Sequence, residues 1–141
     1  QERILTEVYK ACAENGVFLE GSLLKPSMTV SGADNANQAS SEEVAEKTIA
    51  CFKRTVPAAI PGVVFLSGGQ SDEEATVNLN AINQTAKTVG VPWEMSFSYG
   101  RGLQAAPLIV FPLPFCIFVN FWQRISQFPG NGFPNYELLF V

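Results

Sequence analysis

Apolar positions in the first part of the chain recur at two periods, one typical of helices and one typical of buried strands. In residues 3–14 the helical period predicts a buried face made of Ile4, Leu5, Val8, Ala11 and Cys12. Asn15-Gly16 then predicts the end of this helix, because glycine readily adopts the left-handed conformation found there. Val17–Leu24 has the length and apolar content of a buried strand. The chain therefore begins with a helix that is followed by a strand.

The alternation of helix and strand continues after a loop. Residues 26–39 are rich in Ser, Gly, Asn and Ala and show no sustained period, so they predict that loop. Ser40 and Glu43 have capping-box spacing and predict the start of a helix that runs to about Arg54. Its expected buried face is Val44, Thr48, Ile49, Cys51 and Phe52. Gly62–Leu66 then predicts a second strand, of the kind that is buried on both faces in a parallel sheet.

A third unit follows with the same signals. Ser71 and Glu74 form another capping-box match and predict a helix start. The expected inner face of this helix is Ala75, Leu79 and Ile82, whereas Asn78, Asn80 and Asn83 are expected to face outward or to make local hydrogen bonds. Trp93–Ser98 predicts a third strand, and a short helix is expected over Leu103–Ala106.

This order of elements predicts an α/β fold with parallel strands, right-handed crossovers and both faces of the sheet covered. Three strands are too few for a closed barrel or a stable doubly wound sheet. The edges of the predicted sheet would therefore need further strands, and the chain is expected to be part of an α/β protein.

Composition excludes several classes of function. The 141 residues carry a net charge of −4 without a Lys/Arg-rich block, which does not support binding to nucleic acid. Histidine is absent, so this chain has neither a His-based triad nor a His-ligated metal. Cys12, Cys51 and Cys116 are widely spaced and form no metal-ligand pattern or disulfide framework, which suits a reducing compartment.

Composition also changes abruptly near residue 107. Residues 107–141 hold only two of the charged side chains but 7 of the 11 Phe and 5 of the 9 Pro. We expect two regions, a domain over 1–107 and a hydrophobic Phe/Pro-rich tail over 108–141. Leu108–Trp122 is too short, and too interrupted by proline, for the roughly 20 residues that a membrane-spanning helix needs. No membrane partner is expected.

Polar residues stand at the C-terminal end of each predicted strand, where α/β folds carry their sites. The first strand ends at Lys25, where desolvation would lower the pKa of the amine and make it a nucleophile. The alternative is that its ammonium group simply reaches water. Ser67-Gly68-Gly69 follows the second strand, and Ser98-Tyr99-Gly100-Arg101-Gly102 follows the third. Such loops either are plain strand-to-helix turns or bind phosphate, and beside a lysine they suggest Schiff-base chemistry on a phosphorylated carbonyl compound.

Five stretches resemble class I fructose-1,6-bisphosphate aldolase, and they follow one another in the family's register over residues 3 to about 108. They are Leu19–Pro26, which resembles the Schiff-base lysine motif, and Arg54–Ala59, Phe65–Ser71, Asn78–Asn83 and Ser96–Arg101. The resemblance implies a (β/α)8 TIM barrel to which this chain supplies strands 6 to 8. It also implies a homotetramer that cleaves fructose 1,6-bisphosphate reversibly to dihydroxyacetone phosphate and glyceraldehyde 3-phosphate. No cofactor or metal is implied.

The resemblance also implies roles for individual residues. Lys25 would form the Schiff base with the substrate ketone carbon, and Leu66 would lie beside the reacting carbons. The phosphate of the dihydroxyacetone-phosphate half would be bound by Ser67, Gly68, Ser98, Gly100 and Arg101.

Several features depart from the family. The acid, base and helper residues belong to strands that this sequence does not include, and no residue here is expected to replace them. Glu20 lies five residues before Lys25 in the same predicted strand, so its side chain would point to the opposite face of the sheet. It is therefore expected to be structural. Gly102 stands where the family usually has alanine.

The resemblance ends after Leu108, and we interpret residues 108–141 as a translated intron or a frameshift. The alternative function is a truncated, non-catalytic phosphate-binding remnant of the enzyme. We expect a cytoplasmic location, and the alternative is a plastid, because any targeting segment would precede Gln1.

Overall fold

The structure is a computed structural model that describes residues 1–110 and 137–140, with side chains described for residues 1–105. Helices and strands alternate along the chain as the apolar pattern predicts. In order they are α1 (Glu2–Glu14), the 3-10 turn η1 (Leu19–Gly21), β1 (Ser22–Lys25), α2 (Ser41–Thr55), β2 (Gly62–Phe65), α3 (Asp72–Val89), β3 (Glu94–Phe97), α4 (Gly100–Val110) and β4 (Glu137–Phe140).

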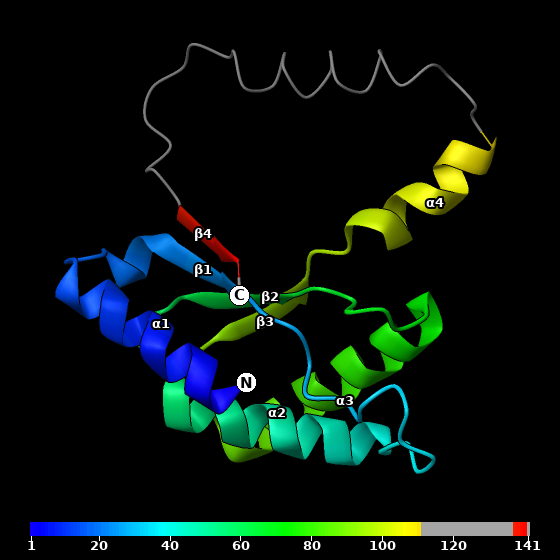
Figure 1. The fold of residues 1–141 in the computed structure, drawn as a ribbon, viewed down its shortest axis with the longest axis horizontal. Coiled ribbons are helices and arrows are strands. Elements are labelled where there is room, and N and C mark those ends of the chain that lie inside the picture. Colours follow the sequence, from blue (N-terminus) through cyan, green and yellow to red (C-terminus); the bar gives the residue numbers. More distant parts are fainter. Residues whose placement is uncertain (111–136, 141) are drawn as a thin grey trace.

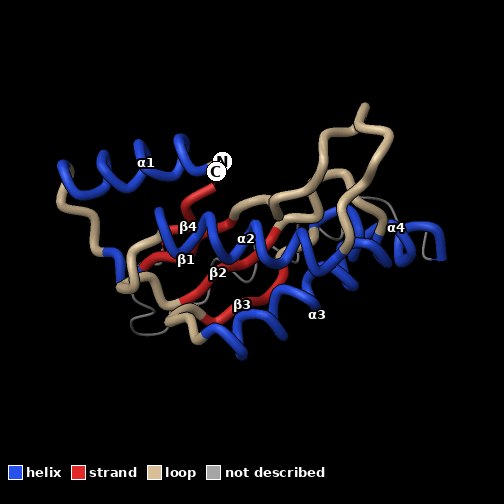
Figure 2. The backbone as a smooth tube through the Cα atoms, turned by 90° about the horizontal axis from the view of Figure 1, so that it is seen from below, coloured by secondary structure: helices blue, strands red, loops and turns tan. Residues whose placement is uncertain are grey.

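The four strands form one sheet in the order β3-β2-β1-β4. All three pairings are parallel, with Leu24 opposite Val63 and Phe65 opposite Phe97. Helices α1, α2 and α3 lie on the same side of this sheet (Figures 1 and 2). The α/β class and the parallel direction of the three predicted strands are therefore confirmed, whereas the expectation that helices cover both faces of the sheet is wrong for α1, α2 and α3 (Figures 1 and 2).

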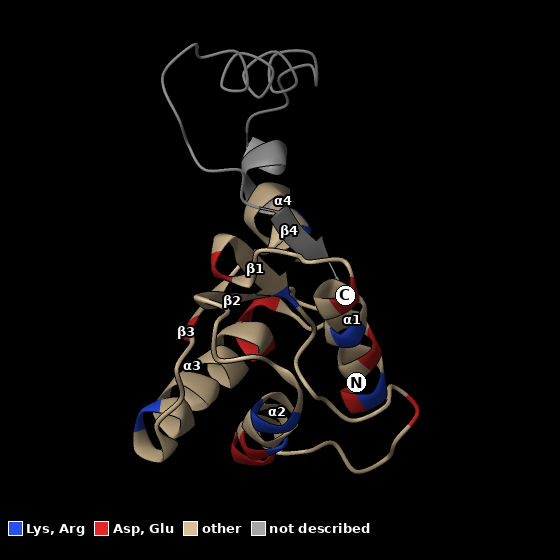
Figure 3. Ribbon diagram, turned by 90° about the vertical axis from the view of Figure 1, so that its left-hand side faces the viewer, with Lys and Arg blue, Asp and Glu red and all other residues tan. Residues whose placement is uncertain are grey.

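The core lies between the sheet and these helices. Val63 and Phe65 of β2 are fully buried, and the Phe65 ring stacks on that of Phe52 with centroids 5.7 Å apart. Trp93 packs edge-on against Phe52 at 6.4 Å, and its indole nitrogen donates to the carbonyl of Pro57 at 2.9 Å. Charged residues lie mainly on the outer surfaces of the helices (Figure 3). This packing fixes β2 and the start of β3 against α2.

The inner faces of the helices agree with the sequence in α2 and less well in α1. All five residues predicted for α2 are buried, and Ala75 and Ile82 are buried in α3. In α1, Leu5 and Cys12 are buried, but Ile4 is 58% exposed. Tyr9, which the prediction left out, is buried instead. The buried face of α1 is therefore centred on Leu5, Tyr9 and Cys12, and the prediction for Ile4 and Ala11 is wrong.

The first strand is shorter than Val17–Leu24. Residues 19–21 form the turn η1, in which the amide of Gly21 donates to the carbonyl of Phe18 at 3.3 Å. The hydroxyl of Ser22 donates back to the carbonyl of Leu19 at 2.8 Å. These local bonds satisfy the backbone in place of a strand ladder. Glu20 therefore lies in the turn and is exposed, so its prediction as a residue of the lysine's own strand is wrong.

The helix boundaries follow their caps. Ser71 and Glu74 form the complete capping box at the start of α3, whereas at α2 only the bond from the Glu43 amide to the Ser40 hydroxyl is present. Helix α4 begins at Gly100 and continues to Val110, so it is longer than the predicted Leu103–Ala106. It also continues past residue 107, where the composition changes.

Strand β4 was not predicted. It pairs with β1 in parallel, with Ser22 opposite Glu137 and Lys25 opposite Phe140. The edge of β1 that faces away from β2 is thus occupied by a segment of the hydrophobic tail (Figure 1). The outer edge of β3 has no neighbouring strand among the described residues.

Candidate active site

The three predicted site segments meet at one edge of the sheet because their strands are parallel and adjacent. Beyond the strand ends, the amide of Leu66 donates to the carbonyl of Pro26 at 3.0 Å. The amide of Ser98 donates to the carbonyl of Phe65 at 2.8 Å. These two bonds continue the ladder between the strands and align the segments that follow Lys25, Phe65 and Phe97. The structure therefore brings the three segments together at the carboxyl ends of the strands.

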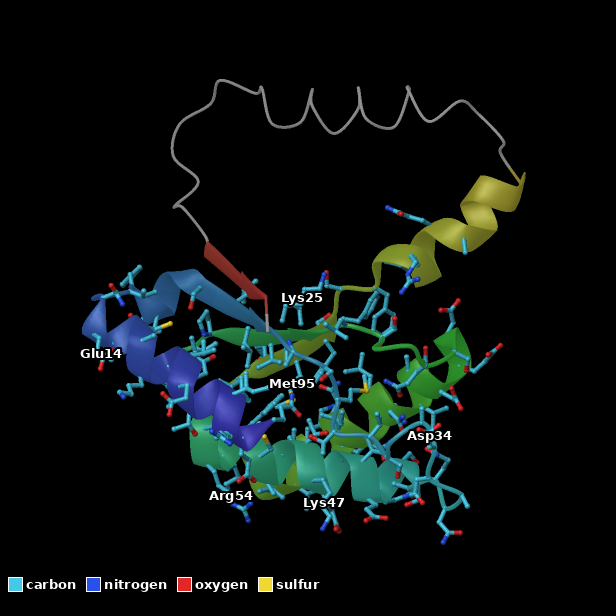
Figure 4. All side chains as sticks on the ribbon, viewed as in Figure 1. Glu14, Lys25, Asp34, Lys47, Arg54 and Met95 are labelled. Atoms are coloured by element: carbon cyan, nitrogen blue, oxygen red, sulfur yellow. The ribbon has the colours of Figure 1, made fainter. Side chains whose placement is uncertain are left out.

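Lys25 is the last residue of β1 and is half-buried. Its neighbour Leu24 is fully buried beneath the helices, and side chains alternate between the faces of a strand. Lys25 therefore lies on the face of the sheet that α1 and α2 do not cover (Figure 4). An amine on this face, at the end of the strand, can reach a molecule that lies over the strand ends.

The loop after β2 contains two glycines with positive φ, and Gln70 holds it by hydrogen bonds to the loop and to α3. Gly68 and Gly69 have φ values of 63° and 87°, the left-handed region that favours glycine. The side-chain nitrogen of Gln70 donates to the carbonyl of Ser67 at 2.8 Å, and its side-chain oxygen accepts from Asn78 at 2.6 Å. A Cβ atom placed on Gly69 would meet nothing within 4 Å. The backbone of this loop is therefore accessible to a ligand while its shape is fixed by α3.

The segment after β3 leads directly into a helix N-terminus. The hydroxyl of the buried Tyr99 donates to the carbonyl of Ala75 at 3.1 Å, and burial raises the pKa of this phenol. Gly100 and Arg101 are exposed, and a Cβ atom placed on Gly100 would also meet nothing within 4 Å. The first helical amides and the guanidinium of Arg101 are donors that suit an anion.

Sequence reasoning missed three residues at this edge. Gln70 holds the glycine loop, as described above. Ser27 follows β1, and its Cβ would be 3.8 Å from a Cβ atom placed on Gly68. The carboxylate of Asp72 lies against Gly102. The contacts of Ser27 and Asp72 join residues that are distant along the chain, and the bonds of Gln70 are closer in sequence but match no capping-box or helix-stop signal.

Three other kinds of feature bear on function: metal-ligand clusters, membrane-spanning helices and free thiols. Within the described residues, no group of three or more His, Cys, Asp or Glu side chains could hold a metal ion. Over the same residues, no helix is both long enough and apolar enough to cross a membrane. Cys12 and Cys51 are buried free thiols, and Cys116 lies outside the described residues.

Comparison with known proteins identifies the family. The model of the family "Fructose-bisphosphate aldolase class-I" matches residues 1–111. The chain belongs to the class I fructose-bisphosphate aldolase family. The match ends three residues beyond Leu108, where the sequence analysis placed the end of the resemblance.

Individual aldolases align over most of this chain but only part of their own length. Fructose-bisphosphate aldolase 4, cytosolic, of Arabidopsis thaliana is 54% identical over 107 residues, which are 76% of this chain and 27% of that protein. The cytoplasmic isozyme of Cicer arietinum is 57% identical, and 29% of it is covered. This chain thus spans less than a third of the length of the curated aldolases it matches.

A solved aldolase shares the arrangement of the elements. The fructose-bisphosphate aldolase of Plasmodium falciparum, in complex with TRAP and a small-molecule inhibitor, matches with a TM-score of 0.71 and 51% identity. The match covers 76% of this chain and 30% of the aldolase chain. The three parallel strands thus correspond to part of an aldolase structure.

Proposed function

We propose that this chain carries the Schiff-base lysine and the substrate-phosphate site of a fructose-bisphosphate aldolase. The observation that supports the proposal best is the meeting of Lys25 and the two glycine-containing segments at one edge of the parallel sheet. In α/β folds this edge, formed by the carboxyl ends of the strands, is the usual place of a site. The substrate class is a phosphorylated ketose or ketone.

In this proposal the nucleophile is the side-chain amine of Lys25. The amine adds to the ketone carbon of the substrate, and loss of water gives the protonated Schiff base. The cation then accepts the electron pair of the breaking carbon–carbon bond, which yields the aldehyde product and an enamine. Protonation of the enamine and hydrolysis regenerate the amine. Leu66, at the end of β2 and partly buried, would lie beside the reacting carbons.

The phosphate of the dihydroxyacetone-phosphate half would be bound by Ser67, Gly68, Ser98, Gly100 and Arg101. Support for this assignment comes from the open backbone at Gly69 and Gly100 and from the exposed guanidinium of Arg101. The start of α4 supplies amide donors and a partial positive charge. Together these groups offer a dianion both hydrogen bonds and charge.

We further propose that the complete protein is a (β/α)8 barrel in which β1, β2 and β3 are strands 6, 7 and 8. The edge of β3 supports this, since it has no strand beside it among the described residues and Phe97 on it is 47% exposed. The missing strands would supply the acid and base residues, and strand 5 would take the edge of β1 that β4 occupies in this chain. A homotetramer and a cytoplasmic location follow from the family and from the names of the plant isozymes. In this proposal residues 1–107 are the aldolase domain, and residues 108–141 are a tail produced by an intron or a frameshift.

An assay of aldol cleavage distinguishes the two candidate functions. The 141-residue chain, which lacks the acid and base groups, should show no turnover of fructose 1,6-bisphosphate. The complete protein should cleave it, and its Lys25→Met variant should not. Turnover by the 141-residue chain would refute the division of roles proposed here. No turnover by the complete protein would favour the alternative, a non-catalytic phosphate-binding remnant.

A further inference from the structure

The start of α4 lies against the start of α3, and their charges are unlike. The first turn of α3 holds Asp72, Glu73 and Glu74, whereas the first turn of α4 holds no acidic residue. Figure 1 shows the two helix starts facing each other at the end of the sheet. An anion is favoured near a helix N-terminus, so α4 can attract a carboxylate from its neighbour.

Two contacts fix the separation of these helix starts. The first is the hydrogen bond from the Tyr99 hydroxyl to the Ala75 carbonyl at 3.1 Å. The second is the approach of Asp72 to Gly102, where a Cβ atom would lie 2.5 Å from Oδ1 and 3.4 Å from Cγ of Asp72. The carboxylate of Asp72 therefore occupies the space that a side chain at position 102 would need.

Gly102 is the third residue of α4, directly after Arg101. No salt bridge joins Asp72 to Arg101 within residues 1–105, so the guanidinium is not neutralised by this carboxylate. The negative charge nevertheless lies beside the turn that is proposed to hold the substrate phosphate. Asp72, Gly100 and Arg101 are all exposed, so two anions at this helix start would repel each other through solvent, and salt would screen that repulsion.

We propose that Asp72 is an internal anion that weakens phosphate binding at Gly100 and Arg101, and that Gly102 is the residue that admits it. This inference rests on the phosphate site of the proposed function. The ligand concerned is a phosphate monoester or inorganic phosphate, since either places its charge on the same donors. Asp72 is a residue that tunes affinity and not a catalytic one.

The test uses the 141-residue chain and inorganic phosphate, with binding followed by NMR at the amides of Gly100 and Arg101. Asp72→Asn should tighten the dissociation constant about fivefold at low salt. The matched control is Glu73→Gln, which removes the same charge from the adjacent position; Glu73 is exposed like Asp72 but does not approach Gly102, so its variant should change the constant less than about twofold. Thermal unfolding of both variants checks that the fold is retained.

Two further readouts separate an electrostatic role from a structural one. The advantage of Asp72→Asn over the wild type should shrink as NaCl is raised to about 1 M, where the Debye length falls to about 3 Å. Gly102→Ala should also tighten binding, because its methyl group displaces the carboxylate, and the double variant should bind no better than Asp72→Asn alone.

The outcomes distinguish this inference from the proposed function. If phosphate binds and Asp72→Asn behaves like Glu73→Gln, the role of Asp72 is overturned while the phosphate site stands. If Asp72→Asn tightens phosphate binding by the same factor at all salt concentrations, the electrostatic role is likewise overturned. If neither the wild type nor Asp72→Asn perturbs the amides of Gly100 and Arg101, the phosphate site is overturned and the inference with it.

Discussion

Two buried tyrosines offer the sharpest test of how the fold holds the candidate site. The hydroxyl of Tyr99 donates to the Ala75 carbonyl at 3.1 Å, which joins the start of α4 to α3. The hydroxyl of Tyr9 in α1 is buried and has no hydrogen-bond partner in the described part of the chain. Replacing each tyrosine with phenylalanine removes the same atom from these two different settings.

The expected effects have opposite signs. Tyr99→Phe removes a buried hydrogen bond and should lower the free energy of unfolding by about 1 kcal/mol. The carbonyl of Ala75 lies inside α3 and keeps its helical bond, so the loss should not be larger. Tyr9→Phe removes a hydroxyl that was desolvated without compensation, and stability should rise by up to about 1 kcal/mol.

Urea unfolding followed by circular dichroism measures both changes. The two midpoints should separate to either side of the wild-type value, with equal slopes. A decrease in stability from Tyr9→Phe as large as that from Tyr99→Phe would refute the reasoning, because it would mean that the Tyr9 hydroxyl has a partner in the folded protein.

The pH dependence follows from the same burial. Burial raises the pKa of both phenols in the folded state. The folded protein then holds these protons more tightly than the unfolded chain, whose tyrosines ionise near pH 10. The two phenols therefore leave the free energy of unfolding unchanged with pH below about pH 10, and they lower it as the pH rises above that value. Tyr9→Phe should reduce this alkaline loss, and an unchanged alkaline limb would contradict the assignment.

Three further predictions concern the cap, the thiols and the added strand. Ser71→Ala should cost about 1 kcal/mol, because it removes the capping-box hydroxyl of α3, whereas Ser71→Thr should cost only a few tenths; thermal unfolding measures both. Cys51 should resist alkylation in the folded chain at pH 8, since it is buried and desolvation raises its pKa, and should react once urea unfolds the protein; peptide mass spectrometry locates the label. Deleting residues 137–141 should speed hydrogen exchange of the β1 amides at least about tenfold and leave the β3 amides unchanged, because only β1 pairs with β4.

Each of these three predictions has a clear contrary result. Equal stability of Ser71→Ala and Ser71→Thr would mean that the cap does not stabilise α3. Alkylation of Cys51 at the same rate with and without urea would mean that the thiol is accessible in the folded chain. Unchanged exchange in β1 after the deletion would mean that β4 does not protect that edge in solution.

The sequence predicts the fold well where signals are local. The capping box at Ser71 and Glu74 and the buried face of α2 follow from spacing alone, and the structure contains both. The class of the sheet follows from the order of elements, since alternation of helix and strand requires parallel pairing. The positions of Lys25 and of the two glycine segments at one edge follow from that pairing.

The remainder depends on contacts that the apolar pattern does not reveal. The turn η1 replaces residues 19–21 of the predicted strand, where the Ser22 hydroxyl bonds to the Leu19 carbonyl, and apolar content does not distinguish this turn from a strand. The exposure of Ile4 follows from where α1 packs against α2, which one helix alone does not determine. Asp72 reaches Gly102 across 30 positions of sequence, so no motif includes both. Strand β4 pairs with β1 although it lies in residues 108–141, for which the apolar pattern predicts no strand.

The tail has a test of its own. If residues 108–141 arise from an intron or a frameshift, transcript sequencing should show the family's C-terminal helix joined after about residue 108. A transcript that encodes the tail as written would count against that proposal, and β4 would then be a regular part of the sheet.

The central claim is that Lys25 is the Schiff-base nucleophile, and reductive trapping tests it most directly. The complete protein is incubated with dihydroxyacetone phosphate and sodium borohydride, and the labelled peptide is identified by mass spectrometry. Our account predicts a single stable adduct on Lys25 that is absent from the Lys25→Met variant. Labelling that persists in Lys25→Met, or that falls on another lysine of the wild type, would contradict it.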